Sequence, residues 1–255
     1  MAVETAEVRS AASALVPAVF VVTWSSAFVA GVIGVAAAPP LLLTFVRFAL
    51  AGLLLAGFAL AVRAPWPRGR RLLHVVVSGA LVMAVQFGAL YSAMALRMPA
   101  AVVALVQGLN PVVIALLAGR FLGERVSRAQ WLGFGLGAAG VGLAVADRVS
   151  LTLSGLALCV LGLLGMSLGT LYQKRFAGDL DVRTVTATQT LTAAPLVGVV
   201  SLATEPMRVD DWGSFSAALA WLVLVNSIGA YLLLNTMLKR GSASRVSTVF
   251  FLTPR

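Results

Sequence analysis

Charged side chains, cysteine and histidine are all scarce in this chain of 255 residues. Only 11% of the residues are charged, Cys159 is the single cysteine and His74 is the single histidine. One cysteine cannot form an intrachain disulfide or a thiolate metal site, and one histidine argues against a histidine-based metal centre or catalytic triad. We therefore expect no catalytic site, no metal ion and no other cofactor.

Acidic residues are also few, and their placement narrows the function. The nine Asp and Glu residues all lie between the long apolar runs or at their ends. A proton-coupled or lipophilic-cation pump commonly uses a buried carboxylate, and a membrane-embedded enzyme needs paired aspartates or a nucleophile with a base. The Gly-x-x-x-x-Gly-Lys-Ser/Thr loop of ATP-driven pumps is absent as well. These absences disfavour an enzyme, an ATP-driven pump and a cation efflux pump.

Apolar residues, in contrast, make up 60% of the chain and occur in long runs. The mean hydropathy is +0.98, and a membrane-crossing helix needs roughly 20 mostly apolar residues. The sequence predicts an all-α integral membrane protein whose partner is the lipid bilayer. The net charge of +10 does not indicate nucleic-acid binding, because the basic residues form short clusters between the apolar runs.

The apolar runs predict eight complete membrane spans and the start of a ninth. Proline and glycine mark most of the short connections, so consecutive helices are expected to be antiparallel neighbours. The predicted spans are 13–34, 40–62, 72–95, 99–121, 129–146, 152–174, 183–203, 214–238 and a partial span from about 242.

Lys and Arg predict the orientation of these spans. If the N-terminus is cytoplasmic, the inner segments carry fourteen Lys and Arg residues, whereas the outer loops carry only Arg97, Arg148 and Arg208. This distribution is a strong positive-inside bias. We therefore expect a multi-pass protein of the cell (inner or plasma) membrane with a cytoplasmic N-terminus.

An internal repeat divides the chain into two parts. Shifting the sequence by 143 residues aligns 88–112 with 231–255 without a gap, with eight identities in 25 positions. The two copies are separated by five spans and therefore have opposite orientations in the membrane. The repeat predicts two inverted domains, 1–147 and 148–255. Inverted repeats are typical of secondary transporters, which bind their substrate near the membrane midplane between the repeats.

Several motifs resemble the EamA-type carriers of the drug/metabolite transporter superfamily. The longest is Ala93 to Val145, with Leu109-Asn110-Pro111, Phe121-Leu122-Gly123-Glu124-Arg125 and Gln130-Trp131-Leu132-Gly133. Further motifs are Thr23 to Phe28 and Phe45 to Phe48. The resemblance covers essentially the whole chain. It implies ten helices in two inverted five-helix repeats (a 5+5 architecture) and alternating-access transport of small metabolites, often as export.

The end of the chain departs from that family pattern. The first repeat continues for 36 residues after Pro111, to Asp147, whereas only Arg255 follows Pro254. About nine of the ten spans are therefore expected here. The expectation is that this is a fragment, a frameshifted product, or a truncated remnant that does not transport alone.

Two features mark candidate binding residues. Arg47 is the only charge well inside a predicted span, and it either recognises an anion or serves a structural role by snorkelling to the surface or bonding backbone carbonyls. Pro111 and Pro254 interrupt equivalent spans, and paired helix breaks in two repeats point to a binding site. The alternative for the prolines is a packing kink.

Uncharged polar residues inside the spans complete the predicted cavity. Each of them lines the cavity or simply bonds a neighbouring helix. The candidate substrate-binding set is Trp24, Arg47, Gln86, Tyr91, Gln107, Asn110, Tyr172, Gln189 and Asn226.

Three functions remain open at this stage. The first is a secondary transporter, in the exporting direction, of small metabolites such as amino acids or other neutral, zwitterionic or anionic solutes. The second is a flippase for lipids or lipid-linked sugars on the same fold, and the third is a non-functional remnant. The substrate identity, the coupling ion and the oligomeric state do not follow from the sequence.

Overall fold

The computed structural model of the chain describes the backbone of residues 2–122 and 152–240, with 127, 131–133, 135–137 and 139–140. Side chains are described for 19–117 and 152–239, and for the same short pieces between 127 and 140. Within these ranges every regular element is a helix, which confirms the all-α prediction.

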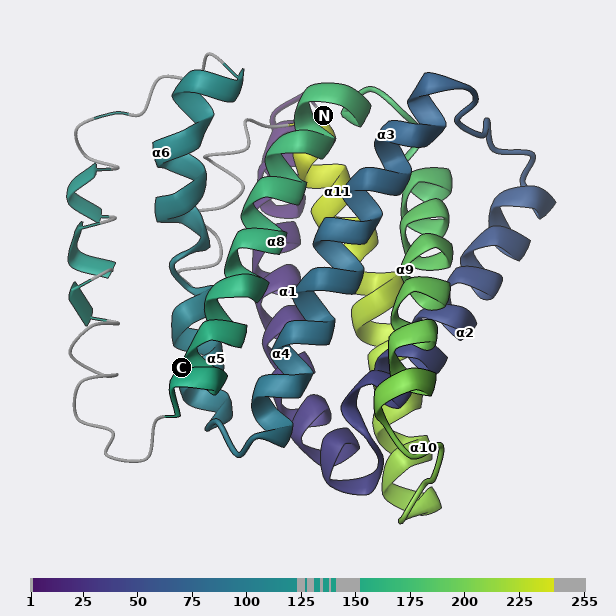
Figure 1. The fold of residues 1–255 in the computed structure, drawn as a ribbon. Coiled ribbons are helices and arrows are strands. Elements are labelled where there is room, and N and C mark those ends of the chain that lie inside the picture. Colours follow the sequence, from purple (N-terminus) through teal and green to yellow (C-terminus); the bar gives the residue numbers. More distant parts are fainter. Residues whose placement is uncertain are drawn as a thin grey trace.

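The described helices follow one another with short connections (Figure 1). In chain order they are α1 (Ala2–Ala37), α2 (Pro40–Ala61), α3 (Arg70–Gly79), η1 (Ala80–Val85), α4 (Gln86–Ala95), α5 (Ala100–Gln107), α6 (Asn110–Leu122), α8 (Leu153–Ala177), α9 (Val182–Thr204), α10 (Trp212–Trp221), η2 (Leu222–Ala230) and α11 (Tyr231–Arg240).

Seven stretches in the described part are long and apolar enough to cross a membrane. They agree with seven predicted spans to within a few residues at most ends. The predicted fifth span, 129–146, is described only in short helical pieces, and the ninth, from 242, lies outside the described residues. The seven stretches are Val19–Ala37, Pro40–Ala61, Arg70–Ala95, Ala100–Leu117, Leu153–Ala177, Val182–Thr204 and Trp212–Lys239.

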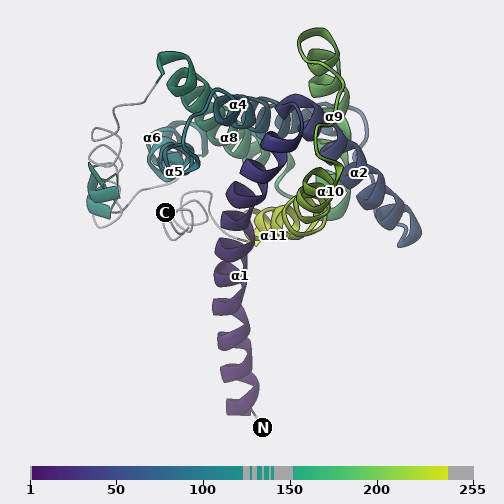
Figure 2. The same ribbon diagram turned by 90° about the horizontal axis from the view of Figure 1, so that it is seen from below.

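Helices far apart in the sequence pack side by side. The second span, α2, lies along the seventh, α9. The third span (α3, η1 and α4) lies along α8, the sixth, and α1 lies along α10 and η2 of the eighth (Figures 1 and 2). A shift of five spans converts the third–sixth pair into the eighth–first pair and leaves the second–seventh pair unchanged.

Two spans depart from α-helical geometry in the middle of the membrane. The third contains the π-helical segment η1, and the eighth contains the π-helical segment η2. Shifted by 143 residues, η1 becomes 223–228, which lies inside η2. Such segments are rare and are frequent at functional sites.

The fourth span is broken next to Pro111. Its first helix, α5, ends at Gln107, and α6 begins at Asn110, so that Gly108 and Leu109 separate them. Pro111 is the second residue of α6, where a missing N–H costs no intrahelical hydrogen bond. The interruption therefore precedes the proline, instead of following from a carbonyl that the proline leaves unpaired. Pro254 lies outside the described residues.

Glycine allows the closest helix contacts. A Cβ atom added to Gly79 on α3 would lie 2.7 Å from the Cα atom of Gln189 on α9, and one added to Gly165 on α8 would lie 2.9 Å from the carbonyl oxygen of Leu81. Small residues commonly permit such approaches between membrane helices. The third span is thus held tightly against both α8 and α9.

Gly79→Ala is expected to destabilise the protein by about 1–3 kcal/mol, because the added methyl group meets a backbone that cannot yield locally. Gly57→Ala is the matched control, since a Cβ atom there has nothing within 4 Å. Unfolding in detergent would measure both variants. Equal stability of the two variants would contradict the close contact between α3 and α9.

Candidate substrate-binding site

Arg47 is completely buried in the middle of α2, with an exposed fraction of 0%. Its Nε donates a hydrogen bond to Ser227 Oγ at 2.7 Å, and its Nη1 donates one to Tyr91 Oη at 2.7 Å. Its Nη2 is buried and has no hydrogen-bond partner. The guanidinium therefore does not snorkel to the surface, and that alternative is wrong.

Aromatic rings surround the Arg47 guanidinium. Its central carbon lies 4.4 Å from the centroid of Phe87, 5.2 Å from that of Phe48 and 6.0 Å from that of Tyr91. The negative face of an aromatic ring attracts a cation and replaces part of its lost hydration. The rings and the two hydroxyl groups thus hold a charge that the bilayer would otherwise disfavour.

No carboxylate in the described part of the chain neutralises Arg47. The ion pairs described there join Arg71 to Asp179, Arg183 to Asp181, and Arg208 to Asp210, all outside the cavity. A buried charge without an opposite charge is costly, and such residues in membrane proteins commonly mark substrate or ion pathways. An anionic group placed at Nη2 would complete the site.

Arg47 forms part of the wall of a cavity that encloses about 410 Å³ of atom-free space. The cavity is formed by residues from α1, α2, η2 and α11 and from the third and fourth spans. Six of the nine predicted residues line it: Trp24, Arg47, Gln86, Tyr91, Gln107 and Asn226.

Three lining amides present an oxygen without a partner: Oε1 of Gln86, Oε1 of Gln107 and Oδ1 of Asn226 are all buried. The Gln107 Nε2 donates to the carbonyl oxygen of Cys159 at 3.3 Å, and the Asn226 Nδ2 donates to that of Thr23. A carbonyl oxygen only accepts, so these two amides must direct their own oxygens elsewhere. The cavity therefore offers one cationic donor and several acceptors.

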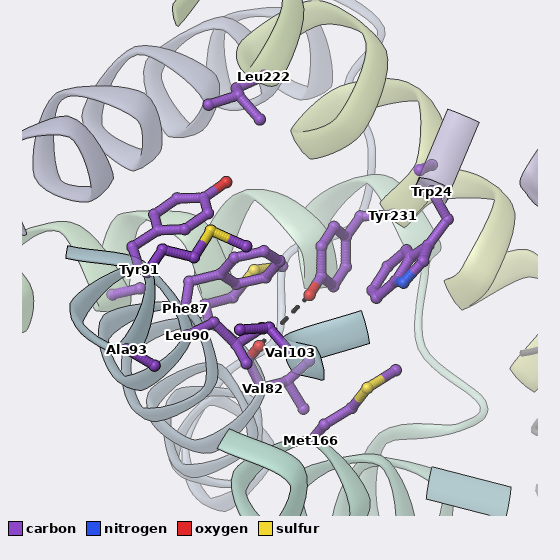
Figure 3. Close-up of a cluster of buried hydrophobic side chains, with 14 of the residues drawn as sticks. Trp24, Val82, Phe87, Leu90, Tyr91, Ala93, Val103, Met166, Leu222 and Tyr231 are labelled. Atoms are coloured by element: carbon purple, nitrogen blue, oxygen red, sulfur yellow. Dashed lines mark hydrogen bonds between the residues drawn. The ribbon is translucent and has the colours of Figure 1, made fainter. Parts of the chain in front are cut away.

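The remaining wall is aromatic and apolar. Trp24 and Tyr231 pack with ring centroids 5.3 Å apart, and Phe87 packs on Tyr91 at 5.8 Å and on Tyr231 at 6.1 Å. Tyr231 Oη donates to the carbonyl oxygen of Val82 in η1 at 3.3 Å, so the two spans that contain π-helical segments meet at this wall (Figure 3).

Several lining residues were not among the predicted site residues. On α4 the predicted residues Gln86 and Tyr91 share their face with Phe87, Leu90 and Met94. This spacing is that of one helix face, so helical periodicity around Gln86 was the signal for these three residues. The other unpredicted lining residues are Ala27, Phe28 and Tyr231.

The other three predicted residues lie outside this cavity because their side chains face other helices. Asn110 Oδ1 accepts a hydrogen bond from Ser167 of α8 at 2.7 Å, while its buried Nδ2 has no partner. Tyr172 Oη lies 2.8 Å from His74 Nδ1. Gln189 donates to Gln173 and to Ser78. Helix-to-helix bonding, the alternative considered above, describes these three.

One acidic residue positions the helix that carries Arg47. The Glu205 carboxylate, at the end of α9, accepts hydrogen bonds from the backbone N–H of Leu41 at 3.0 and 3.1 Å and of Leu42 at 3.0 Å. These N–H groups belong to the first turn of α2, where a negative charge is favourable. Sequence reasoning did not assign this role, since α2 and Glu205 are more than 160 residues apart.

A bundle of membrane-spanning helices with an incompletely paired cation in an internal cavity defines a class, the multi-pass membrane transporters. Sequence comparison specifies the family. The model of the EamA-like transporter family matches residues 12–146 and 153–255. The chain belongs to this family, which is part of the drug/metabolite transporter superfamily and is a family of transporters rather than enzymes.

Its curated relatives are also described as transporters. The "Uncharacterized inner membrane transporter YedA" of Escherichia coli K12 is 27% identical over 236 residues, which cover 91% of this chain and 76% of the relative. The "Uncharacterized transporter YvbV" of Bacillus subtilis is 25% identical over 252 residues, covering 95% and 80%. "Protein PecM" of Dickeya dadantii is 28% identical over 184 residues, covering 71% and 62%.

A solved crystal structure of another protein has the same fold. It superposes with a TM-score of 0.74 at 24% identity, over 96% of this chain and 85% of that one. At this identity the likeness establishes the fold alone.

Tyr91→Phe is expected to lower the free energy of unfolding by about 1–3 kcal/mol, because it leaves a second nitrogen of a buried guanidinium without a partner. Tyr172→Phe is the matched control, since it removes a hydroxyl that bonds the half-buried His74. Denaturation in detergent would compare the two variants. A loss at Tyr172 as large as that at Tyr91 would contradict the special cost at Arg47.

Proposed function

We propose that this protein is a secondary transporter of the cell membrane that moves small carboxylate-bearing metabolites by alternating access. Its cavity binds the carboxylate on Arg47. The N-terminus is cytoplasmic, and the two halves, 1–147 and 148–255, form inverted five-span repeats of which about nine spans are present in this chain. Export is the proposed direction, on the family resemblance.

Two structural relations support the inverted repeat. The packing pairs of the third span with the sixth and of the first with the eighth exchange under a shift of five spans. The π-helical segments η1 and η2 overlap under the same 143-residue shift that aligns the sequence repeat. Inverted repeats allow one half to rock against the other around a central site.

The observation that carries the substrate class is the unpartnered Nη2 of Arg47. A guanidinium with its other nitrogens occupied binds a carboxylate oxygen through a charge-assisted hydrogen bond. The acceptor oxygens of Gln107 and Asn226 suit an ammonium or hydroxyl group on the same molecule. A zwitterion such as an amino acid matches both sets, and the aromatic wall suits an apolar side chain.

Arg47→Met is expected to reduce carboxylate transport by about 10- to 100-fold, which corresponds to the loss of one hydrogen bond to a charged group. Radiolabelled amino acids, hydroxy acids and dicarboxylates would be tested for uptake into proteoliposomes, with uncharged sugars for comparison. Arg97→Gln, in an exposed outer segment, is the matched control and should transport normally.

The same variant separates a binding role from a structural role. Replacing a buried unpaired charge by an apolar residue of similar volume is often neutral or stabilising. Arg47→Met should therefore unfold at the same temperature as the native protein or a higher one, while transport is lost. Lower stability with retained transport would show that Arg47 serves the fold and not the substrate.

One feature favours a flippase for lipids or lipid-linked sugars as a second candidate function. In the described part of the chain, a mostly apolar hollow with about 1180 Å³ of atom-free space lies between α1 and α5. Phe28 lines both this hollow and the Arg47 cavity. A lipid tail in the hollow would place its headgroup near Arg47.

A fluorescent-lipid assay would decide between the two candidate functions. Proteoliposomes with lipids labelled in one leaflet should show no faster exchange between leaflets than empty liposomes, because the first candidate carries a water-soluble solute. Protein-dependent exchange that Arg47→Met abolishes would favour the flippase instead.

A further inference from the structure

A second buried polar group lies apart from the Arg47 cavity. It consists of Ser78, Gln173, Thr186, Gln189 and Asn235, which we call the amide cluster. These residues come from α3, α8, α9 and α11, and none of their side chains is more than 5% exposed.

Hydrogen bonds close the amide cluster on itself. Gln189 Nε2 donates to Gln173 Oε1 at 2.8 Å and to Ser78 Oγ at 3.0 Å. Gln173 Nε2 donates to Asn235 Oδ1 at 2.7 Å, and Asn235 Nδ2 donates to Thr186 Oγ1 at 2.6 Å. None of the buried nitrogen and oxygen atoms of these five residues lacks a partner, in contrast to the Arg47 cavity.

A separate cavity, which we call the inner vestibule, adjoins the amide cluster. It encloses about 240 Å³ of atom-free space between the C-terminal ends of α8 and α11 and the start of α9. Gln173 and Asn235 of the cluster line it, together with Lys174 and Lys239. The positive-inside orientation directs these helix ends towards the cytoplasm.

One face of α11 connects the two cavities. Tyr231 lines the Arg47 cavity, Asn235 belongs to the amide cluster and Lys239 lines the inner vestibule. These residues are four apart and therefore lie on the same side of the helix, over about 12 Å of its length. The amide cluster thus lies between the vestibule and the Arg47 cavity.

The inner vestibule is positively charged. Lys174 Nζ donates to the carbonyl oxygen of Leu238, and Lys239 Nζ donates to that of Leu180 at 3.1 Å, so both ammonium groups cross between helices. No acidic residue is among the lining residues that the structure describes.

The nearest acids are held by arginines outside the vestibule. Asp179 pairs with Arg71 at 3.2 Å, and Asp181 pairs with Arg183 at 2.7 Å. The hydrogen bond from the Arg183 side chain lowers the pKa of the Asp181 carboxyl below its ordinary value. These carboxylates are therefore occupied by other cations, and the lysine charges remain available to an anion.

We propose that the inner vestibule is the cytoplasmic capture site for the transported carboxylate, which Lys174 and Lys239 attract. The amide cluster is the closed barrier that the substrate crosses to reach Arg47. The proposal rests on the proposed transport function. It adds a site, a direction of access and a charge selectivity to that function.

Charged thiol reagents test the vestibule without a known substrate. The single native cysteine is buried, so Cys159→Ala gives a background in which Val182→Cys, at the vestibule wall, is the only thiol. Inside-out membrane vesicles would be treated with membrane-impermeant methanethiosulfonates, one bearing a sulfonate and one a trimethylammonium group. The measured quantity is the ratio of their two labelling rates, divided by the same ratio for a small free thiol.

The anionic reagent is expected to be favoured by about tenfold at Val182→Cys, because cations close to a thiol attract it and repel its cationic counterpart. Lys174→Gln and Lys239→Gln should each reduce this preference by about fivefold. Glutamine retains a donor for the carbonyl that each lysine bonds. Arg175→Gln removes the same charge one residue away, outside the vestibule lining, and should leave the preference nearly unchanged.

Three results would overturn the proposal. They are no labelling from the inner side, a ratio equal to that of the free thiol, and an equal effect of Arg175→Gln and Lys174→Gln. The labelling ratio reports charge and access, whereas the Arg47→Met experiment reports transport. A failure of either proposal is therefore recognised independently of the other.

Discussion

The burial of one guanidinium without an opposite charge is the constraint on which the site depends. In a low-dielectric interior the cost of desolvating such a group is several kcal/mol, and no carboxylate in the described residues offsets it at Arg47. Two hydroxyl groups and three aromatic rings provide partial compensation. The helices that supply them, from both halves of the chain, must therefore pack together around a group whose last nitrogen is unpartnered. A substrate carboxylate removes that deficit, which makes binding favourable at a site the protein keeps incomplete.

The two buried polar groups show how related backbone positions acquire different roles. Arg47 lies on α2 and Gln189 on α9, the two helices that pack along each other. Each bonds a residue of the other half, Ser227 for Arg47 and Ser78 for Gln189. Arg47 is charged and incompletely bonded, whereas the amide cluster is neutral and fully bonded, so only the first gains by binding a ligand. The neutral cluster stabilises helix packing, by about 1 kcal/mol for each such bond in a membrane.

The sequence was most informative where a single property decides the outcome. Helix length and hydropathy located seven spans, because a bilayer requires long apolar helices and tolerates few alternatives. Arg47 and the polar residues near it were recognisable from their cost in lipid. Tyr172 and Gln189 were not separable from Gln86 and Asn226, because a polar residue on a hydrophobic helix does not reveal which neighbour it faces. Glu205 at the first turn of α2 was equally hidden, since that contact depends on the packing of α2 against α9.

The π-helical segments explain part of this difficulty. A π turn contains more residues than an α turn, so each such segment rotates the helix face beyond it relative to regular α periodicity. Gln86 follows η1 directly, while Asn226 and Ser227 lie inside η2. The orientation of these polar side chains is thus determined by two irregular segments that no simple sequence period predicts. Tyr231, the first residue after η2, donates to a carbonyl of η1, so the irregular parts of both halves are joined to each other at the wall of the cavity. A change in the relative position of the two halves must act on this bond and on the Arg47–Ser227 bond, which couples the shape of the cavity to the arrangement of the repeats.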